Sequence, residues 1–264
     1  MGWDSPDEGF WQEIQPYTGA VHSSARVERG FTADVTATVE SEAGPVFVKG
    51  YHLPSRDKVC FDRELSINAY VQSVSPPLLW HHVSDTWAVL GFELVPGVTA
   101  DFKPGSPDLP SVVDALNRIA AIECPVVAQE WAEWRFDRFT DTPELFAGNA
   151  LLHSDIAPGN FLMHNGAATV VDWAYPTRGA AFLDCAQLVV QLIAADHTPE
   201  DAERWAEGCK AWQSADPVAV DAFVAAEYRL QQWAAEKYPG EDWRKAMSRA
   251  ATEWAEYRRT LGGA

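Results

Sequence analysis

Three oxygen-bearing side chains stand out within one short stretch of the sequence, residues 151–173. They are Asp155, Asn160 and Asp172, and each is set among apolar neighbours. Carboxylate and amide oxygens suit Mg²⁺, which keeps several waters and binds phosphate oxygens. An acid that is not needed for the metal can accept a proton from a hydroxyl group. One Asp that orients a nucleophile, with an Asn and a second Asp that hold metal ions on phosphates, is typical of phosphoryl transfer.

A predicted hairpin positions these side chains. Asn165-Gly166 separates two apolar runs, residues 161–163 and 168–171. Asn-Gly between two such runs is a strong signal for a tight turn between antiparallel strands. We expect the hairpin to fold Asp172, at the exit of the second strand, back beside the other two side chains.

A resemblance to the aminoglycoside phosphotransferase family is carried by His153-Ser-Asp155-Ile-Ala-Pro-Gly-Asn160 and by the later Val171-Asp172-Trp173. Members of this family are protein-kinase-like enzymes that phosphorylate small molecules. The resemblance is strong over residues 151–186, weaker in the N-terminal third, and faint in the C-terminal third. The family often has Gly where this chain has Ser154, and protein kinases have Arg there. Protein kinases also have Asp-Phe-Gly where this chain has Asp-Trp-Ala, so both differences argue against a protein substrate.

The resemblance implies roles for the residues of this stretch. Asp155 would be the catalytic base or the residue that orients the acceptor hydroxyl, and Asn160 and Asp172 would bind Mg²⁺. The donor would be ATP or GTP. His153 is expected to orient the loop, and Asp184, at the start of a predicted helix, is expected to brace the loop backbone.

Lys49 is the candidate phosphate ligand. It follows the apolar run 46–48, and a lysine in such a strand is costly to bury unless it is paired. By the resemblance it contacts the α- and β-phosphates, and Glu64, fifteen residues later on a predicted helix, is its ion partner. Asp57 and Asp62 are the alternative partners.

The resemblance also implies two nucleotide contacts made by the backbone. The turn after the first strand would cover the phosphates with the amides of Gly30, Phe31 and Thr32, although a single Gly is a weak motif by itself. The segment after the last strand of the sheet would bind adenine, through Glu93 and Val95.

The expected fold class is α+β, a protein-kinase-like bilobal fold with a small antiparallel β lobe and a larger, mainly helical lobe. We place the small lobe at residues 1–95 and the large lobe at 96–264. Alternation and turn signals predict five strands, with a helix between the third and fourth strands at 57–74. Apolar periodicity and boundary prolines predict the helices of the large lobe at residues 109–122, 127–139, 184–195, 199–213, 216–238 and 240–260.

The composition of the chain disfavours several kinds of partner and location. The 264-residue chain has a formal charge of −18, which disfavours nucleic acid and anionic lipid as partners and favours a cationic small molecule. No apolar run approaches the roughly 20 residues of a membrane span, and no signal pattern begins the chain, so we expect a cytoplasmic protein. The four cysteines form no metal-binding spacing and are expected to be reduced.

The resulting hypothesis is a phosphotransferase that moves the γ-phosphoryl group of ATP or GTP to a hydroxyl of a small molecule. An aminoglycoside-type or other natural-product antibiotic is the leading acceptor, and antibiotic resistance would follow. A kinase of an aminosugar, choline or homoserine is one alternative. A non-catalytic nucleotide-binding module is another. The sequence does not define the oligomeric state.

Overall fold

The computed structural model describes residue 6, residues 8–27 and residues 32–262. Gly30 and Phe31, two of the expected phosphate contacts, lie outside the described residues. The chain divides into two compact units. The first comprises residues 1–97 and Thr169–Ala174, and the second comprises Val98–Ala168 and Tyr175–Ala264.

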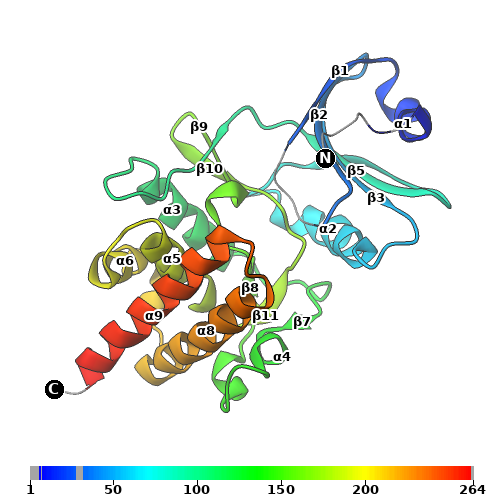
Figure 1. Cartoon of the computed structure of the whole chain (residues 1–264). Coiled ribbons are helices and arrows are strands. Elements are labelled where there is room, and N and C mark those ends of the chain that lie inside the picture. The colour runs from blue at the N-terminus through cyan, green and yellow to red at the C-terminus, as the bar shows by residue number, and fades with distance from the viewer. Residues whose placement is uncertain (1–5, 7, 28–31, 263–264) are drawn as a thin grey trace. The chain divides into compact units, whose positions relative to one another are not determined.

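The first unit is built on the predicted five-stranded antiparallel sheet (Figure 1). Its strand order is β1-β2-β3-β5-β4. The strands are β1 (Val21–Arg26), β2 (Val35–Ser41), β3 (Gly44–His52), β4 (Leu78–Val83) and β5 (Trp87–Glu93). Two helices belong to this unit, α1 (Glu8–Thr18) and α2 (Lys58–Val71).

The two helices cover opposite faces of the sheet, as the alternation of side chains along β3 shows. Val48 packs in an apolar cluster with Phe10 of α1. The next residue, Lys49, points to the other face and reaches Glu64 of α2. Gly50 lets α1 approach closely, because a Cβ there would meet the Phe10 ring at 2.7 Å. Lys49 therefore lies between the sheet, whose other face packs against α1, and the helix α2.

A segment from the middle of the chain completes the first unit. The Val170 amide donates to the Val74 carbonyl at 2.8 Å, and the Trp173 indole N–H donates to Ser75 Oγ at 2.6 Å. These two bonds attach the residues on both sides of Asp172 to the turn that follows α2. Asp172 therefore belongs to the same unit as Lys49.

The second unit contains short strands and most of the helices. Its strands are β6 (Val98–Thr99), β7 (Glu130–Trp131), β8 (Ala150–Leu152), β9 (Phe161–His164), β10 (Ala167–Val170), whose second half joins the first unit, and β11 (Thr177–Gly179). Its helices are α3 (Leu109–Ala120), α4 (Ala132–Phe136), α5 (Leu183–Ala194), α6 (Pro199–Ala206), α7 (Lys210–Gln213), α8 (Pro217–Lys237) and α9 (Asp242–Gly262). Two 3₁₀ turns are η1 (Pro143–Phe146) and η2 (Pro158–Asn160).

The predicted hairpin forms between β9 and β10. Asn165 and Gly166 both have positive φ, 50° and 75°, which is the conformation of a type I′ turn. The Gly166 carbonyl accepts a hydrogen bond from Ser111 of α3, so the turn is also anchored to a helix.

An aromatic core holds the helices around the loop that carries Asp155. Phe223 of α8 makes edge contacts with Phe136 of α4, Phe146 of η1 and Phe182, just before α5. Trp254 of α9 also packs against Phe223 and is fully buried. Aromatic pairs of this kind add to the free energy of burial and fix the packing geometry.

Two of the predicted helices are wrong in extent. In place of a helix over 127–139, Trp131 pairs with Arg178 as the strand β7, and only Ala132–Phe136 is helical. In place of one helix over 199–213, α6 ends at Ala206 and α7 begins at Lys210. Gly208 lies in this break, where a Cβ would meet Val113 of α3 at 2.8 Å. Both differences arise from contacts distant in sequence.

None of the helices within the described residues has an apolar stretch long enough to cross a membrane.

Candidate active site

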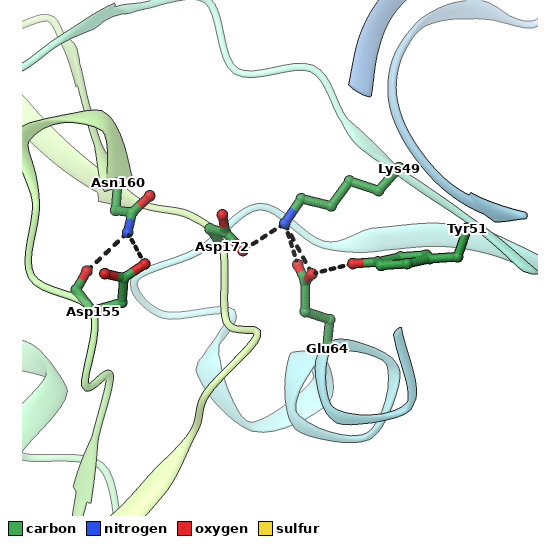
Figure 2. Close-up of polar contacts among 6 residues, drawn as sticks. All are labelled: Lys49, Tyr51, Glu64, Asp155, Asn160 and Asp172. Carbon is green, nitrogen blue, oxygen red and sulfur yellow. Dashed lines mark hydrogen bonds and ion pairs between the residues drawn. The ribbon is translucent and has the colours of Figure 1, made fainter. Parts of the chain in front are cut away.

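Lys49 and Glu64 form the expected ion pair in the first unit. The Lys49 Nζ lies 2.9 Å from both carboxylate oxygens of Glu64 (Figure 2). Both side chains are almost fully buried. The alternative partner Asp62 instead pairs with Lys58 on the exposed side of α2.

The same lysine also binds Asp172, which the sequence did not indicate. Its Nζ lies 2.7 Å from Asp172 Oδ1, so one cation is shared by two carboxylates (Figure 2). Asp172 has a φ of 67°, a conformation that Asp tolerates better than most residues. Its side chain keeps 25% exposure, whereas those of Lys49 and Glu64 keep 8% and 4%.

The contacts among Lys49, Glu64 and Asp172 shift the pKa values of the lysine and of Glu64. Burial by itself lowers the pKa of Lys49, but the charges of Glu64 and Asp172 outweigh burial and raise that pKa above its ordinary value. Burial, followed by repulsion from Asp172, raises the pKa of Glu64 to about 7, although Lys49 opposes the shift. The pKa of Lys49 is raised because two acids share its charge, whereas the pKa of Glu64 is raised mainly by burial and then by the second acid.

Tyr51 and Thr32 lie beside this ion cluster. The Tyr51 hydroxyl donates to Glu64 Oε1 at 3.4 Å. Burial and the charge of Glu64 raise the pKa of Tyr51, so the phenol stays protonated. Thr32, one of the expected phosphate contacts, lies within hydrogen-bonding reach of Tyr51. The position of Tyr51 could have been inferred, because it is two residues after Lys49 on the same strand face.

Asp155 is the exposed member of an otherwise buried loop in the second unit. Residues 151–154 and Ile156 are buried, and Asp155 alone among them faces solvent. The Asn160 amide Nδ2 donates to the Asp155 backbone oxygen at 2.8 Å and to its Oδ2 at 3.0 Å. In Figure 2 the amide oxygen of Asn160 points away from Asp155. Asn160 therefore orients the Asp155 carboxylate, a contact that the sequence did not indicate.

Asp184 braces the loop backbone, as the resemblance implied. Its two carboxylate oxygens accept hydrogen bonds from the backbone amides of His153, at 2.7 Å, and Ser154, at 3.0 Å. Burial raises the pKa of Asp184, although His153 and the two backbone donors oppose the shift. A buried carboxylate that accepts two backbone hydrogen bonds fixes the residues immediately before Asp155.

Ser154 occupies a strained position. Its φ of 63° lies in the left-handed region, where Gly carries no steric penalty. This conformation explains why Gly is frequent at that position in the family that the sequence resembles. The Ser154 carbonyl accepts a hydrogen bond from Arg135 Nη2 at 2.9 Å. No local sequence signal pointed to Arg135.

The two residues expected to contact adenine lie at the end of the sheet. Glu93 is exposed at the end of β5, and Val95 is half-buried two residues later. The Glu93 amide donates to the Pro77 carbonyl at 3.0 Å.

Two residues expected to bind a metal ion, Asn160 and Asp172, offer oxygen donors. Within the described part of the chain, no group of three or more His, Cys, Asp or Glu side chains is placed to hold a metal ion. Mg²⁺ commonly takes only one or two protein carboxylates and completes its shell with water and phosphate oxygens. The Asp172 carboxylate and the Asn160 amide oxygen are oxygen donors of that kind.

Comparison with known proteins gives matches only at the level of structure. No family model matches the chain, and no curated protein matches its sequence.

Several solved structures share the fold. Choline kinase LicA from Streptococcus pneumoniae superposes with a TM-score of 0.69 at 14% identity, covering 95% of this chain and 99% of that chain. A thermostable mutant of aminoglycoside phosphotransferase APH(4)-Ia, in a ternary complex with AMP-PNP and hygromycin B, gives 0.67 at 14% identity, covering 98% and 100%. Amicoumacin kinase hAmiN, in complex with AMP-PNP, Ca²⁺ and Ami, gives 0.63 at 12% identity, covering 97% of each chain. The predicted fold class is confirmed, and the chain has the protein-kinase-like fold of the aminoglycoside phosphotransferases.

Proposed function

We propose that this protein transfers the γ-phosphoryl group of ATP or GTP to a hydroxyl of a small molecule. The observation that carries the proposal is the buried Lys49 that binds both Glu64 and Asp172. A buried lysine held by two acids is an expensive arrangement for stability alone. It is suited to binding phosphate oxygens, because the lysine is already fixed and the more exposed acid can exchange its partner for a metal ion.

The nucleotide would be held by residues of the first unit. Lys49, fixed by Glu64, would bind the phosphates, and the turn with Gly30, Phe31 and Thr32 would cover them with its amides. Adenine would bind the backbone of residues 93–95, including Val95. Because the Glu93 amide already donates to a carbonyl, we expect Glu93 to contribute its own carbonyl oxygen.

Asn160 and Asp172 are the residues that would hold Mg²⁺. Their amide and carboxylate oxygens fit its preference for oxygen donors. When bound, Mg²⁺ would neutralise charge on the phosphates. Asn160 would act through its amide oxygen, since its amide nitrogen is engaged by Asp155.

Asp155 would receive the proton of the acceptor hydroxyl. In the proposed reaction, the hydroxyl oxygen forms a bond to the γ-phosphorus while the bond between this phosphorus and the β–γ bridging oxygen breaks. The nucleoside diphosphate leaves, and the hydroxyl proton passes to the Asp155 carboxylate. The loop contacts of Asn160 and Asp184 hold that carboxylate in a fixed direction, which favours transfer by positioning.

An antibiotic of the aminoglycoside type or another natural product is the acceptor that we favour. The formal charge of −18 would attract a cationic acceptor, and two of the proteins with this fold are named as an aminoglycoside phosphotransferase and an amicoumacin kinase. A metabolite such as choline, an aminosugar or homoserine is the second candidate, because choline kinase LicA shares the fold. A non-catalytic nucleotide-binding module is disfavoured by the intact Lys49, Asp155, Asn160 and Asp172.

The test is mass spectrometry of reactions that contain Mg-ATP or Mg-GTP and a panel of hydroxylated antibiotics, aminosugars, choline and homoserine. We expect one acceptor to gain a phosphoryl group with the wild type. Asp155→Ala should bind nucleotide normally but form no product, while Asp141→Ala, which removes an exposed acid elsewhere in the second unit, should react like the wild type. Normal turnover by Asp155→Ala would refute the assignment.

A further inference from the structure

Arg135 of α4 contacts the peptide bond from which Asp155 extends. Its Nη2 donates to the Ser154 carbonyl at 2.9 Å, and that carbonyl belongs to the planar peptide unit that joins Ser154 to Asp155. On the other side of Ser154, the amide donates to Asp184 Oδ1 at 3.0 Å. Ser154 is therefore held from both ends, by an acid on its N–H and by a guanidinium on its C=O.

The conformation of Ser154 explains why two anchors are needed. A left-handed φ of 63° is unfavourable for a residue other than Gly, because its Cβ crowds the following carbonyl oxygen. A strained residue of this kind persists only where the surrounding contacts over-determine it. If the Ser154 carbonyl were released, the peptide could rotate, and the Asp155 side chain would leave the backbone in a different direction.

Arg135 is itself fixed, although the residue is exposed. Its guanidinium lies over the Tyr175 ring, 5.3 Å from the centroid. Two buried carboxylates lie in its field, Asp184 of α5 and Glu227 of α8. Burial raises the pKa of each, and the positive charge of Arg135 opposes both shifts. A planar guanidinium with several N–H groups can serve a carbonyl, an aromatic face and nearby acids at once.

We propose that Arg135 is a positioning residue, which fixes the direction of Asp155 by holding the Ser154 carbonyl. The proposal rests on the proposed function, in which Asp155 receives the hydroxyl proton. Arg135 need not touch either substrate. Its role is to keep the strained peptide before Asp155 in one orientation, and through it the distance between the carboxylate and the acceptor hydroxyl.

The test compares Arg135→Gln and Arg135→Lys with Arg138→Gln. Arg138 is the matched control, because it is an exposed arginine on the same segment that lies over the Phe139 and Trp233 rings. We expect Arg135→Gln to lower kcat by about 10- to 100-fold, since small displacements of a catalytic group have effects of that size. The KM for nucleotide should not change, because the residues proposed to contact the nucleotide directly lie in the first unit.

A structural readout accompanies the kinetics. Hydrogen exchange, measured by mass spectrometry on a peptide that spans residues 152–157, should be faster in Arg135→Gln than in the wild type. Arg135→Lys keeps the charge near Asp184 and one donor, so it should restore part of the kcat and part of the exchange protection. Arg138→Gln should resemble the wild type in both measurements.

The outcomes separate this proposal from the proposed function. An unchanged kcat and unchanged exchange in Arg135→Gln would overturn the role of Arg135 while the kinase activity stands. Equal losses in Arg135→Gln and Arg138→Gln, or a raised nucleotide KM, would also overturn it, because they indicate general damage to the fold. If the wild type transfers no phosphoryl group, faster exchange in Arg135→Gln still supports the anchoring of the loop, whereas the missing product refutes the proposed function.

Discussion

Removing Lys49 should destabilise the protein far more than removing the charge of Glu64. The Lys49 Nζ lies 2.9 Å from Glu64 and 2.7 Å from Asp172. At an effective dielectric constant near 20, each contact corresponds to a gross attraction of about 6 kcal/mol, most of which is offset by desolvation. Lys49→Met removes the cation that both acids contact, and we expect a loss of about 3–5 kcal/mol in the free energy of unfolding at pH 8.

Glu64→Gln should behave differently, because Lys49 keeps Asp172 as a partner. Burial and Asp172 raise the pKa of Glu64 from 4.5 to about 7, a shift equivalent to about 3 kcal/mol. A carboxyl group whose folded-state pKa is raised contributes stability below pH 4.5, and this contribution is lost as the pH rises through 7. Wild-type stability should therefore fall between pH 5 and pH 8, and Glu64→Gln should remove that part of the fall.

The assay is urea unfolding of four proteins at pH 5 and pH 8: the wild type, Lys49→Met, Glu64→Gln and the double variant. At pH 8 we expect Glu64→Gln to lie within about 1 kcal/mol of the wild type or above it. The double variant should recover part of the stability lost in Lys49→Met, since it also removes the charge of Glu64, one of the two acids that the lysine contacts. Equal losses in the two single variants at pH 8 would refute the reasoning that one cation is shared by two acids.

Two further predictions concern the loop before Asp155. Asp184→Asn replaces an accepting oxygen with an NH₂ group that faces a backbone N–H, so it should cost about 1–3 kcal/mol in urea unfolding, and a smaller loss would contradict the bracing role. Ser154→Gly relieves the strain of the left-handed backbone but adds entropy to the unfolded chain, so its stability should equal or exceed that of the wild type by up to about 1 kcal/mol. Ser154→Val should be less stable than the wild type, because a β-branched side chain is poorly accommodated at a φ of 63°, and thermal unfolding that ranks Val above Gly would exclude this explanation.

Features that depend on short sequence patterns could be predicted. Alternation and turn signals predicted the strands of the first unit, and Asn165-Gly166 predicted the hairpin. The Lys49–Glu64 pair followed from an isolated lysine in an apolar strand, together with the family resemblance. In each case the residues that carry the prediction lie within a short stretch, or on two neighbouring elements separated by a known number of residues.

Features that depend on distant contacts could not be predicted. The ion pair between Lys49 and Asp172 joins residues 123 positions apart. The sequence around Asp172 indicated only a metal ligand and gave no sign of a lysine partner. Nothing in the sequence distinguishes Arg135 from the other arginines, and only the fold brings it to the Ser154 carbonyl. The break between α6 and α7 depends on the approach of Val113 to Gly208, which no periodicity reveals.

The attachment of Thr169–Ala174 to the first unit has a consequence for biosynthesis. The chain leaves the ribosome from its N-terminus, so the sheet, α1 and α2 emerge well before Asp172. During that interval Lys49 and Glu64 can pair, but the partner for the Val74 carbonyl and the second acid for the lysine have yet to be synthesised. A nascent chain stopped at residue 97 would therefore carry an unfinished unit, and the first unit could not be transplanted into another protein as one continuous segment.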